Sequence, residues 1–230
     1  MLSNRENKQS AGFTLIELMI VMAMVGIVAA AMYAAFEAQV RGQVSQDISL
    51  AMTQNLRAAI DLIASDIRMA GCDPDGSSGA TIEAASANSL LMTMDIGGGA
   101  QGQPDGVIGP GERVQYAINT GGNLGRAVDN GNLDPLHGVD LQCDALNFVY
   151  LDVNDTPFVP ATAADRNRIN AIQVSIVIRS ADTGVANPGL LRSYTNNTVY
   201  RNLQGVAIYT APGDTARRFQ LSETVDCRNL

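Results

Sequence analysis

One carboxylate, Glu17, lies inside an otherwise uncharged apolar run that extends from Phe13 to Phe36. The run is about long enough to cross a bilayer as a single helix. An ionised carboxylate in that setting is costly unless a partner neutralises it. The chemistry that it offers is charge pairing, because a carboxylate and an amine that are each costly in lipid relieve one another. Glu17 is therefore the first candidate site residue.

Signals for catalysis are weak. The one histidine, His137, lies in a Pro-Leu-His-Gly segment typical of a surface loop, and the chain has no His-Glu-x-x-His or Gly-x-Ser-x-Gly motif. Gly97, Gly99 and Gly102 match the Gly-x-Gly-x-x-Gly spacing of dinucleotide sites. Pro104 follows instead of the helix that would hold a pyrophosphate. We expect neither an enzyme nor a bound cofactor.

Acidic side chains gather near Asp95, Asp105 and the segment from Asp152 to Asp155. An EF-hand calcium loop needs regularly spaced oxygen ligands closed by a glutamate. The spacing here is wrong for that, so turn chemistry explains these residues and no metal site is predicted.

Charge is distributed unevenly along the 230 residues, whose formal net charge is −8. A polar leader, Met1 to Gly12, carries Arg5, Glu6 and the chain's only lysine, Lys8. Basic residues before the apolar run and an acidic bulk after it predict a cytoplasmic N-terminus, with the bulk outside the inner membrane.

An acidic domain is also a poor candidate for binding nucleic acid through phosphate contacts. The one basic pair, Arg217-Arg218, we interpret as a device that protects a strand edge.

The segment Gly12 to Leu18 reads Gly-Phe-Thr-Leu-Ile-Glu-Leu and resembles the processing signature of type IV prepilins. The resemblance implies cleavage between Gly12 and Phe13 by a membrane prepilin peptidase, and N-methylation of Phe13. It also implies that Glu17, then the fifth residue, pairs with the α-amino group of a neighbouring subunit in a filament. The alternative is a plain signal anchor with an accidental glutamate.

The helix is expected to continue beyond the membrane. Apolar residues recur at steps of three and four, which marks one helical face; they are Val40, Val44, Ile48, Met52, Leu56, Ile60, Ile63 and Ile67. Gly71 and Pro74 then favour an end, which predicts one helix from Phe13 to Ala70. We expect the stripe to pack on a sheet of its own domain; a coiled-coil partner is the alternative.

Glycine-rich turns and short alternating runs follow, and residues 97–112 are predicted to be a loop. The predicted strands are 89–94, 113–118, 146–152, 172–179, 205–210 and 219–228. The fold class is α+β, a pilin-like arrangement of a long N-terminal helix and a mainly antiparallel sheet. Its predicted parts are leader 1–12, transmembrane half-helix 13–36, amphipathic half-helix 37–71 and β-rich domain 72–230.

Three cysteines would face an oxidising compartment. If strands 143–152, 172–180 and 219–228 are successive antiparallel neighbours, Cys143 and Cys227 lie at opposite ends of the sheet. A disulfide needs Cα atoms within about 7 Å. The expected bond therefore joins Cys72 with Cys143 or with Cys227.

Less specific similarities narrow the resemblance to PilW-type minor pilins: the segment Leu62–Pro74, a turn at Asn123–Arg126, and an ending with Arg217-Arg218 and Arg228-Asn229-Leu230. They imply a structural subunit that helps initiate type IV pilus assembly at the tip. Its partners would be other minor pilins, the major pilin, the prepilin peptidase and, before assembly, the inner membrane; its destination is the cell-surface pilus. A minor pseudopilin of type II secretion and a membrane-tethered periplasmic binding or adhesin module remain alternatives.

Overall fold

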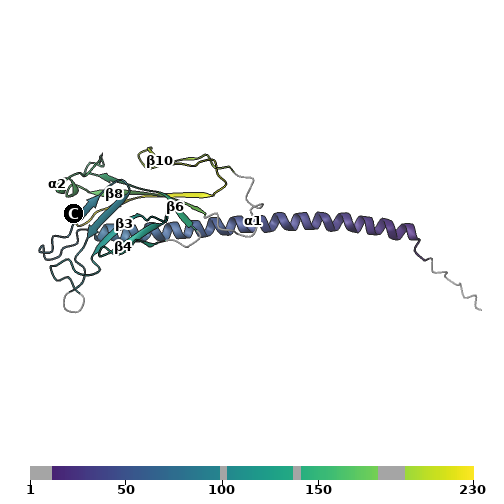
Figure 1. The fold of residues 1–230 in the computed structure, drawn as a ribbon, viewed down its shortest axis with the longest axis horizontal. Coiled ribbons are helices and arrows are strands. Elements are labelled where there is room, and N and C mark those ends of the chain that lie inside the picture. Colours follow the sequence, from purple (N-terminus) through teal and green to yellow (C-terminus); the bar gives the residue numbers. More distant parts are fainter. Residues whose placement is uncertain (1–11, 99–102, 137–140, 181–194) are drawn as a thin grey trace, which may run out of the picture. The chain divides into compact units, whose positions relative to one another are not determined.

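The computed structural model describes residues 12–98, 103–136, 141–180 and 195–230, and His137 lies outside these ranges. One helix, α1 (Leu15–Met69), begins the described chain, close to the predicted Phe13–Ala70 (Figure 1). The chain divides into two compact units, Met1–Asp47 and Ile48–Leu230, so α1 contributes to both.

In the first unit, α1 contains a segment that is long and apolar enough to cross a membrane, and none of that segment is buried. Its large side chains are exposed throughout, for example Ile16, Ile20, Ile27 and Phe36. An unbroken apolar surface of this length is costly in water and is satisfied by lipid or by neighbouring helices.

In the second unit, α1 supplies the centre of the core. Met52, Leu56, Ile60, Ile63 and Ile67 are at most 3 % exposed. Burying each such side chain contributes about 1.5–3 kcal/mol. The stripe therefore packs on the chain's own domain as predicted from Ile48 onward, whereas Val40 and Val44 belong to the first unit.

The helix ends as the sequence predicts. Gly71 has φ +74°, a left-handed conformation that suits glycine, and the Cys72 N–H donates to Met69 O at 3.0 Å. The C-terminus returns to this point, where the Asn229 side chain donates to Arg68 O at 2.9 Å.

The first sheet has five antiparallel strands in sequence order: β1 (Ile82–Ala85), β2 (Ser89–Thr93), β3 (Arg113–Ile118), β4 (Leu124–Val128) and β5 (Asp134–Pro135). Of these five strands, β2 and β3 were predicted from the sequence. The expected turn at Asn123–Arg126 is wrong: the turn lies at Asn119–Asn123, where the Asn119 N–H donates to Asn123 O, and β4 begins at Leu124. Gly125 conceals this strand in the sequence, because glycine is depleted in strands.

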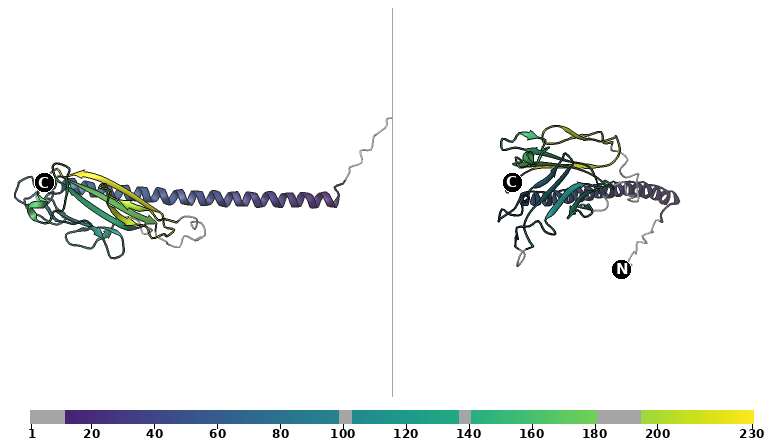
Figure 2. Two further views of the ribbon diagram at one scale, coloured as in Figure 1. Left: turned by 90° about the horizontal axis from the view of Figure 1, so that it is seen from above. Right: turned by 60° about the vertical axis from the view of Figure 1, so that its left-hand side comes forward.

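The second sheet has the order β11–β8–β6–β7 and is also antiparallel: β6 (Leu141–Leu151), β7 (Pro157–Phe158), β8 (Ala171–Ser180) and β11 (Arg218–Asp226). A separate pair joins β9 (Val199–Arg201) to β10 (Ala207–Thr210), and a short helix α2 spans Ala163–Arg166. The core cluster combines residues of α1 with residues of both sheets. Figure 2 shows the C-terminal part of α1 lying alongside the strands. This confirms the α+β class.

Candidate assembly site and the surrounding chemistry

Glu17 is tied to Thr14 at the first turn of α1. The Thr14 backbone N–H and its hydroxyl both donate to Glu17 Oε2 at 2.9 Å, and the Glu17 N–H donates back to Thr14 Oγ1 at 3.3 Å. This reciprocal pattern is a capping box, which satisfies backbone donors that a helix start leaves unpaired. Thr14 was not among the predicted site residues, although its Thr-x-x-Glu spacing to Glu17 is a sequence signal that could have identified it.

The cap leaves half of the carboxylate available. Both Thr14 donors converge on Oε2, and among the described residues no hydrogen bond reaches Glu17 Oε1. Phe13, the residue next to the cap, is 89 % exposed. Thr14 thus fixes the carboxylate at the helix start while one oxygen can still accept a cationic donor from another chain.

At the C-terminal end of the apolar stretch, three side chains one helical turn apart form a second hydrogen-bonded group. The Tyr33 hydroxyl donates to Glu37 Oε1, and Arg41 donates to Glu37 Oε2, each at 2.9 Å. Spacing of four residues places these groups on one face. They mark where α1 changes from apolar to polar.

The predicted cleavage position is open. Gly12 and Phe13 are exposed, and a methyl group added at Gly12 would meet nothing within 4 Å among the described atoms. Residues 1–11 of the leader lie outside the described residues.

All three cysteines are free thiols. Cys143 lies opposite Ile178, whereas Cys227 directly follows the pair Asp226–Ala171, so the two occupy opposite ends of the sheet as expected. Burial raises the pKa of both thiols to about 12. Of these two, Cys227 belongs to the C-terminal segment, whose Asn229 bonds to Arg68 in the last turn of α1, and Cys72 follows that helix end in the sequence.

In the acidic loops, buried carboxylates accept hydrogen bonds from backbone N–H groups. Glu112, 3 % exposed, accepts from the N–H groups of Ile96, Gly97 and Gly109 at 2.6–2.8 Å. Asp95, fully buried, accepts from Asp105 and Gly106. Burial alone would raise the pKa of Glu112, but its three donors outweigh burial and lower it. Turn chemistry therefore explains these residues, and the described ranges hold no group of three potential metal ligands.

Arg218 corrects a prediction, because it does not protect a strand edge. Its side chain is 1 % exposed. Its Nε lies 2.6 Å from Asp144 Oδ2, its two Nη atoms lie 2.5 and 2.6 Å from the oxygens of Asp214, and its guanidinium lies over the Tyr209 ring. Hydrogen bonding to Arg218 holds the pKa of Asp214 below its usual value. The second sheet is thereby fastened to the segment that follows β10.

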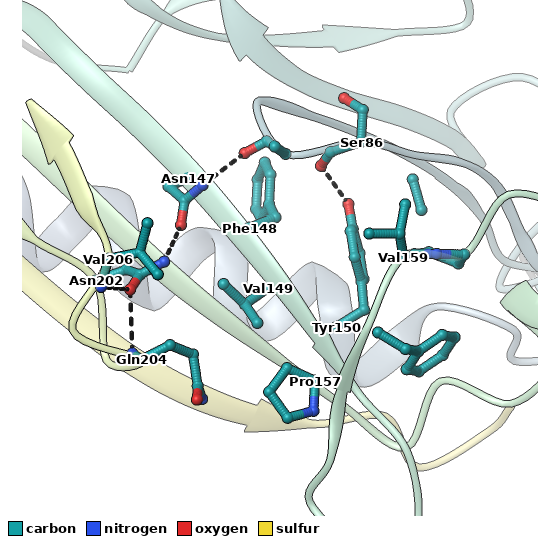
Figure 3. A pocket seen from close by; sticks show the side chains of 14 residues that line it. Ser86, Asn147, Phe148, Val149, Tyr150, Pro157, Val159, Asn202, Gln204 and Val206 are labelled. Atoms are coloured by element: carbon teal, nitrogen blue, oxygen red, sulfur yellow. Dashed lines mark hydrogen bonds between the residues drawn. The ribbon is translucent and has the colours of Figure 1, made fainter.

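An apolar cavity of about 410 Å³ lies beside β6 (Figure 3). The cavity is lined by Phe148, Val149 and Tyr150 of β6, by the turn between β1 and β2, by β7 and the residues after it, and by the turn between β9 and β10. None of these described lining residues is charged. Its polar groups bond to one another: Tyr150 donates to Ser86 O at 2.7 Å, and Asn202 to Asn147 at 2.9 Å.

The comparisons with known proteins bear on the start of the chain. Residues 7–33 match the family model described as the prokaryotic N-terminal methylation motif. The chain carries a prepilin methylation motif. The match contains Gly12, Phe13, Thr14 and Glu17, so the capping box lies within it.

Among solved structures, a type IV-like pilin from Thermus thermophilus is similar at 17 % identity and a TM-score of 0.49. The alignment covers 77 % of this chain and 95 % of that one. No curated protein matches.

Proposed function

We propose that this chain is a minor pilin, a structural subunit that helps start a type IV pilus and stays at its tip. The observation that carries the proposal is the course of α1. A methylation motif opens a helix whose exposed apolar half leads, without a break, into turns that form the core of a β-rich domain. A subunit of this kind can be held in the bilayer by its apolar half-helix before assembly, and can then pack that half against other helices in a filament.

Glu17 supplies the pairing step in this proposal. In the bilayer, the Thr14 donors partly satisfy its carboxylate. After cleavage between Gly12 and Phe13, the new amine of a neighbouring subunit would meet the free oxygen, and both charges would be neutralised. Cleavage, methylation of Phe13 and the pairing of Glu17 together make up the proposed assembly chemistry.

The first test is the mature N-terminus. Mass spectrometry of the purified protein should find it at methylated Phe13. Gly12→Val should keep the leader attached, because the peptidase must approach the backbone closely there, while Gly26→Val, within the apolar helix, is the control that leaves cleavage intact. A wild-type chain that begins at Met1 would disprove the pilin proposal.

Fractionation separates this function from a tethered binding module. A pilin should be present in filaments sheared from the cell surface, whereas a tethered module would stay in the inner-membrane fraction. A location restricted to a secretion apparatus would favour the related pseudopilin.

A further inference from the structure

The sheet edges of this protein differ in how well they are protected. The edge strand β1 is interrupted by a bulge, and β5 and β7 are two residues long and each contains a proline. Short edge strands, bulges and prolines prevent unwanted strand pairing. β11 has none of these: nine residues pair with β8 in unbroken register, without proline, glycine or lysine.

Hydrogen bonds at the two ends of β11 show which of its residues face outward. The Ser180 N–H donates to Arg217 O at 2.9 Å, and the Cys227 N–H donates to Asn170 O at 2.8 Å. In an antiparallel ladder such bonded pairs alternate. Odd-numbered residues of β11 therefore bond to β8, and the backbone groups of even-numbered residues point away from it.

The outward groups lack partners within the described chain. No hydrogen bond joins the backbone of Gln220, Ser222, Thr224 or Asp226 to any described residue outside β8. Thr224 and Asp226 are exposed. These residues span seven positions, which is roughly 23 Å of extended chain at about 3.3 Å per residue.

We propose that this edge binds an extended segment of a different protein, which adds a strand to the sheet beside β11. Another backbone is the ligand that matches a row of alternating N–H and C=O groups. The inference goes beyond the proposed filament role and does not depend on it.

Charge indicates the chemistry of that segment. Between Phe219 and Asp226 the strand carries two acidic residues, Glu223 and Asp226, and no basic residue. Arg218, at the start of β11, is buried against Asp144 and Asp214 and does not offset this charge at the edge. The Glu223 side chain is 38 % exposed, and its carboxylate lies 3.5 Å from the Arg68 guanidinium. We therefore expect a lysine or arginine opposite it. A second copy of this chain is disfavoured because it would bring the same acidic residues into one ladder.

Site-specific cross-linking tests the proposal in cells that make the full-length chain. The photoreactive residue p-benzoylphenylalanine replaces Thr224 or, separately, Asp226, and Val153 in the turn after β6 serves as a control position. The expected cross-links reach one basic-containing segment of one other protein, at points two residues apart. Cross-links to this chain itself, or to scattered sites, would overturn the proposal.

A proline tests the backbone contact itself. Thr224→Pro removes an outward N–H and keeps every bond to β8, so thermal unfolding should confirm a folded domain. Cross-linking from position 226 should fall about fivefold, the usual effect of one lost hydrogen bond, while Thr224→Ala should leave it unchanged. An unchanged yield in the proline variant would refute strand addition. Cross-links that persist in cells whose sheared filaments lack the protein would refute the pilin proposal alone.

Discussion

At the scale of single residues, Glu17 has two roles that make different demands. As the last member of a capping box it stabilises the start of α1, and as an acceptor it has one oxygen left for another chain. A glutamine can still accept from Thr14 but carries no charge. The cap and the pairing can therefore be separated by substitution.

We predict that Glu17→Ala and Glu17→Gln are both cleaved and inserted, because removing a charge makes the bilayer state easier. Both should assemble poorly, since the amine of a neighbour loses its counter-charge. Immunoblots of membrane and sheared-filament fractions measure this. Glu37→Gln, outside the apolar run, is the matched control, and normal assembly of the Glu17 variants would remove the residue from the site.

Arg218 belongs to the same scale. Arg218→Met should lower the free energy of unfolding by about 3 kcal/mol, because Asp214 would lose its ion-pair partner and Asp144 would keep only Arg179. The neighbouring Arg217→Met, which makes no side-chain ion pair in the described structure, should change it by less than about 0.5 kcal/mol. Chemical denaturation of the two variants gives the comparison, and equal stability would contradict the network.

The ion pair between Arg218 and Asp214 also makes the stability of the domain depend on pH. The pKa of Asp214 is lower folded than unfolded, so its stabilising contribution is complete above its ordinary value and declines as pH falls through the depressed one. The wild-type domain should lose this contribution only below about pH 4.

At the scale of elements, the end of α1 is a crowded junction. A Cβ at Gly71 would lie 2.7 Å from Asn229 O and 2.6 Å from Leu230 Cδ2, and the residue has φ +74°. Gly76 has a similar φ of +68° but open surroundings. Gly76→Ala should cost about 1 kcal/mol from backbone strain alone, and Gly71→Ala clearly more. Thermal denaturation compares them, and equal losses would mean that the C-terminal contact contributes nothing.

The same junction leads us to propose which cysteines pair. In an oxidising compartment we expect Cys72 to bond to Cys227, since the C-terminal segment docks at the end of α1, and Cys143 to stay a buried thiol. Peptide mapping after alkylation of the unfolded, unreduced chain should find a label on Cys143 alone. A label on Cys227 with Cys72 bridged to Cys143 would show the alternative pairing.

Elements with a clear period were predictable, and the others were not. β8 alternates four β-branched residues, Ile172 to Ile178, and was predicted within a residue of each end. β1 is four residues long and alanine-rich, and β7 contains a proline, so neither has a sequence signal above that of a loop. Burial of Arg218 could not be predicted, because Asp144 lies 74 positions away in sequence.

At the scale of the whole molecule, the sequence predicted one helix that continues from an apolar half into a β-rich domain, and α1 contributes to both compact units. The domain that contains residues 48–230 is large for a repeating subunit of a slender filament. Copies packed at a short rise would crowd one another, whereas at a tip nothing lies above the domain.

We therefore predict that the protein is a trace component whose deletion abolishes or sharply reduces filaments. Quantitative mass spectrometry of sheared filaments measures the abundance of the protein. Electron microscopy of the deletion strain shows whether filaments are lost. An abundance equal to that of the main subunit would make it a major pilin. Plentiful filaments without it would make it an accessory.

The sharing of α1 also has a mechanical meaning. Tension applied to the apolar end is carried along a continuous hydrogen-bonded helix into Met52, Leu56 and Ile60, which are interlocked with both sheets. The domain should therefore resist a pull on its anchor as one body, and it would yield only when the core itself ruptures.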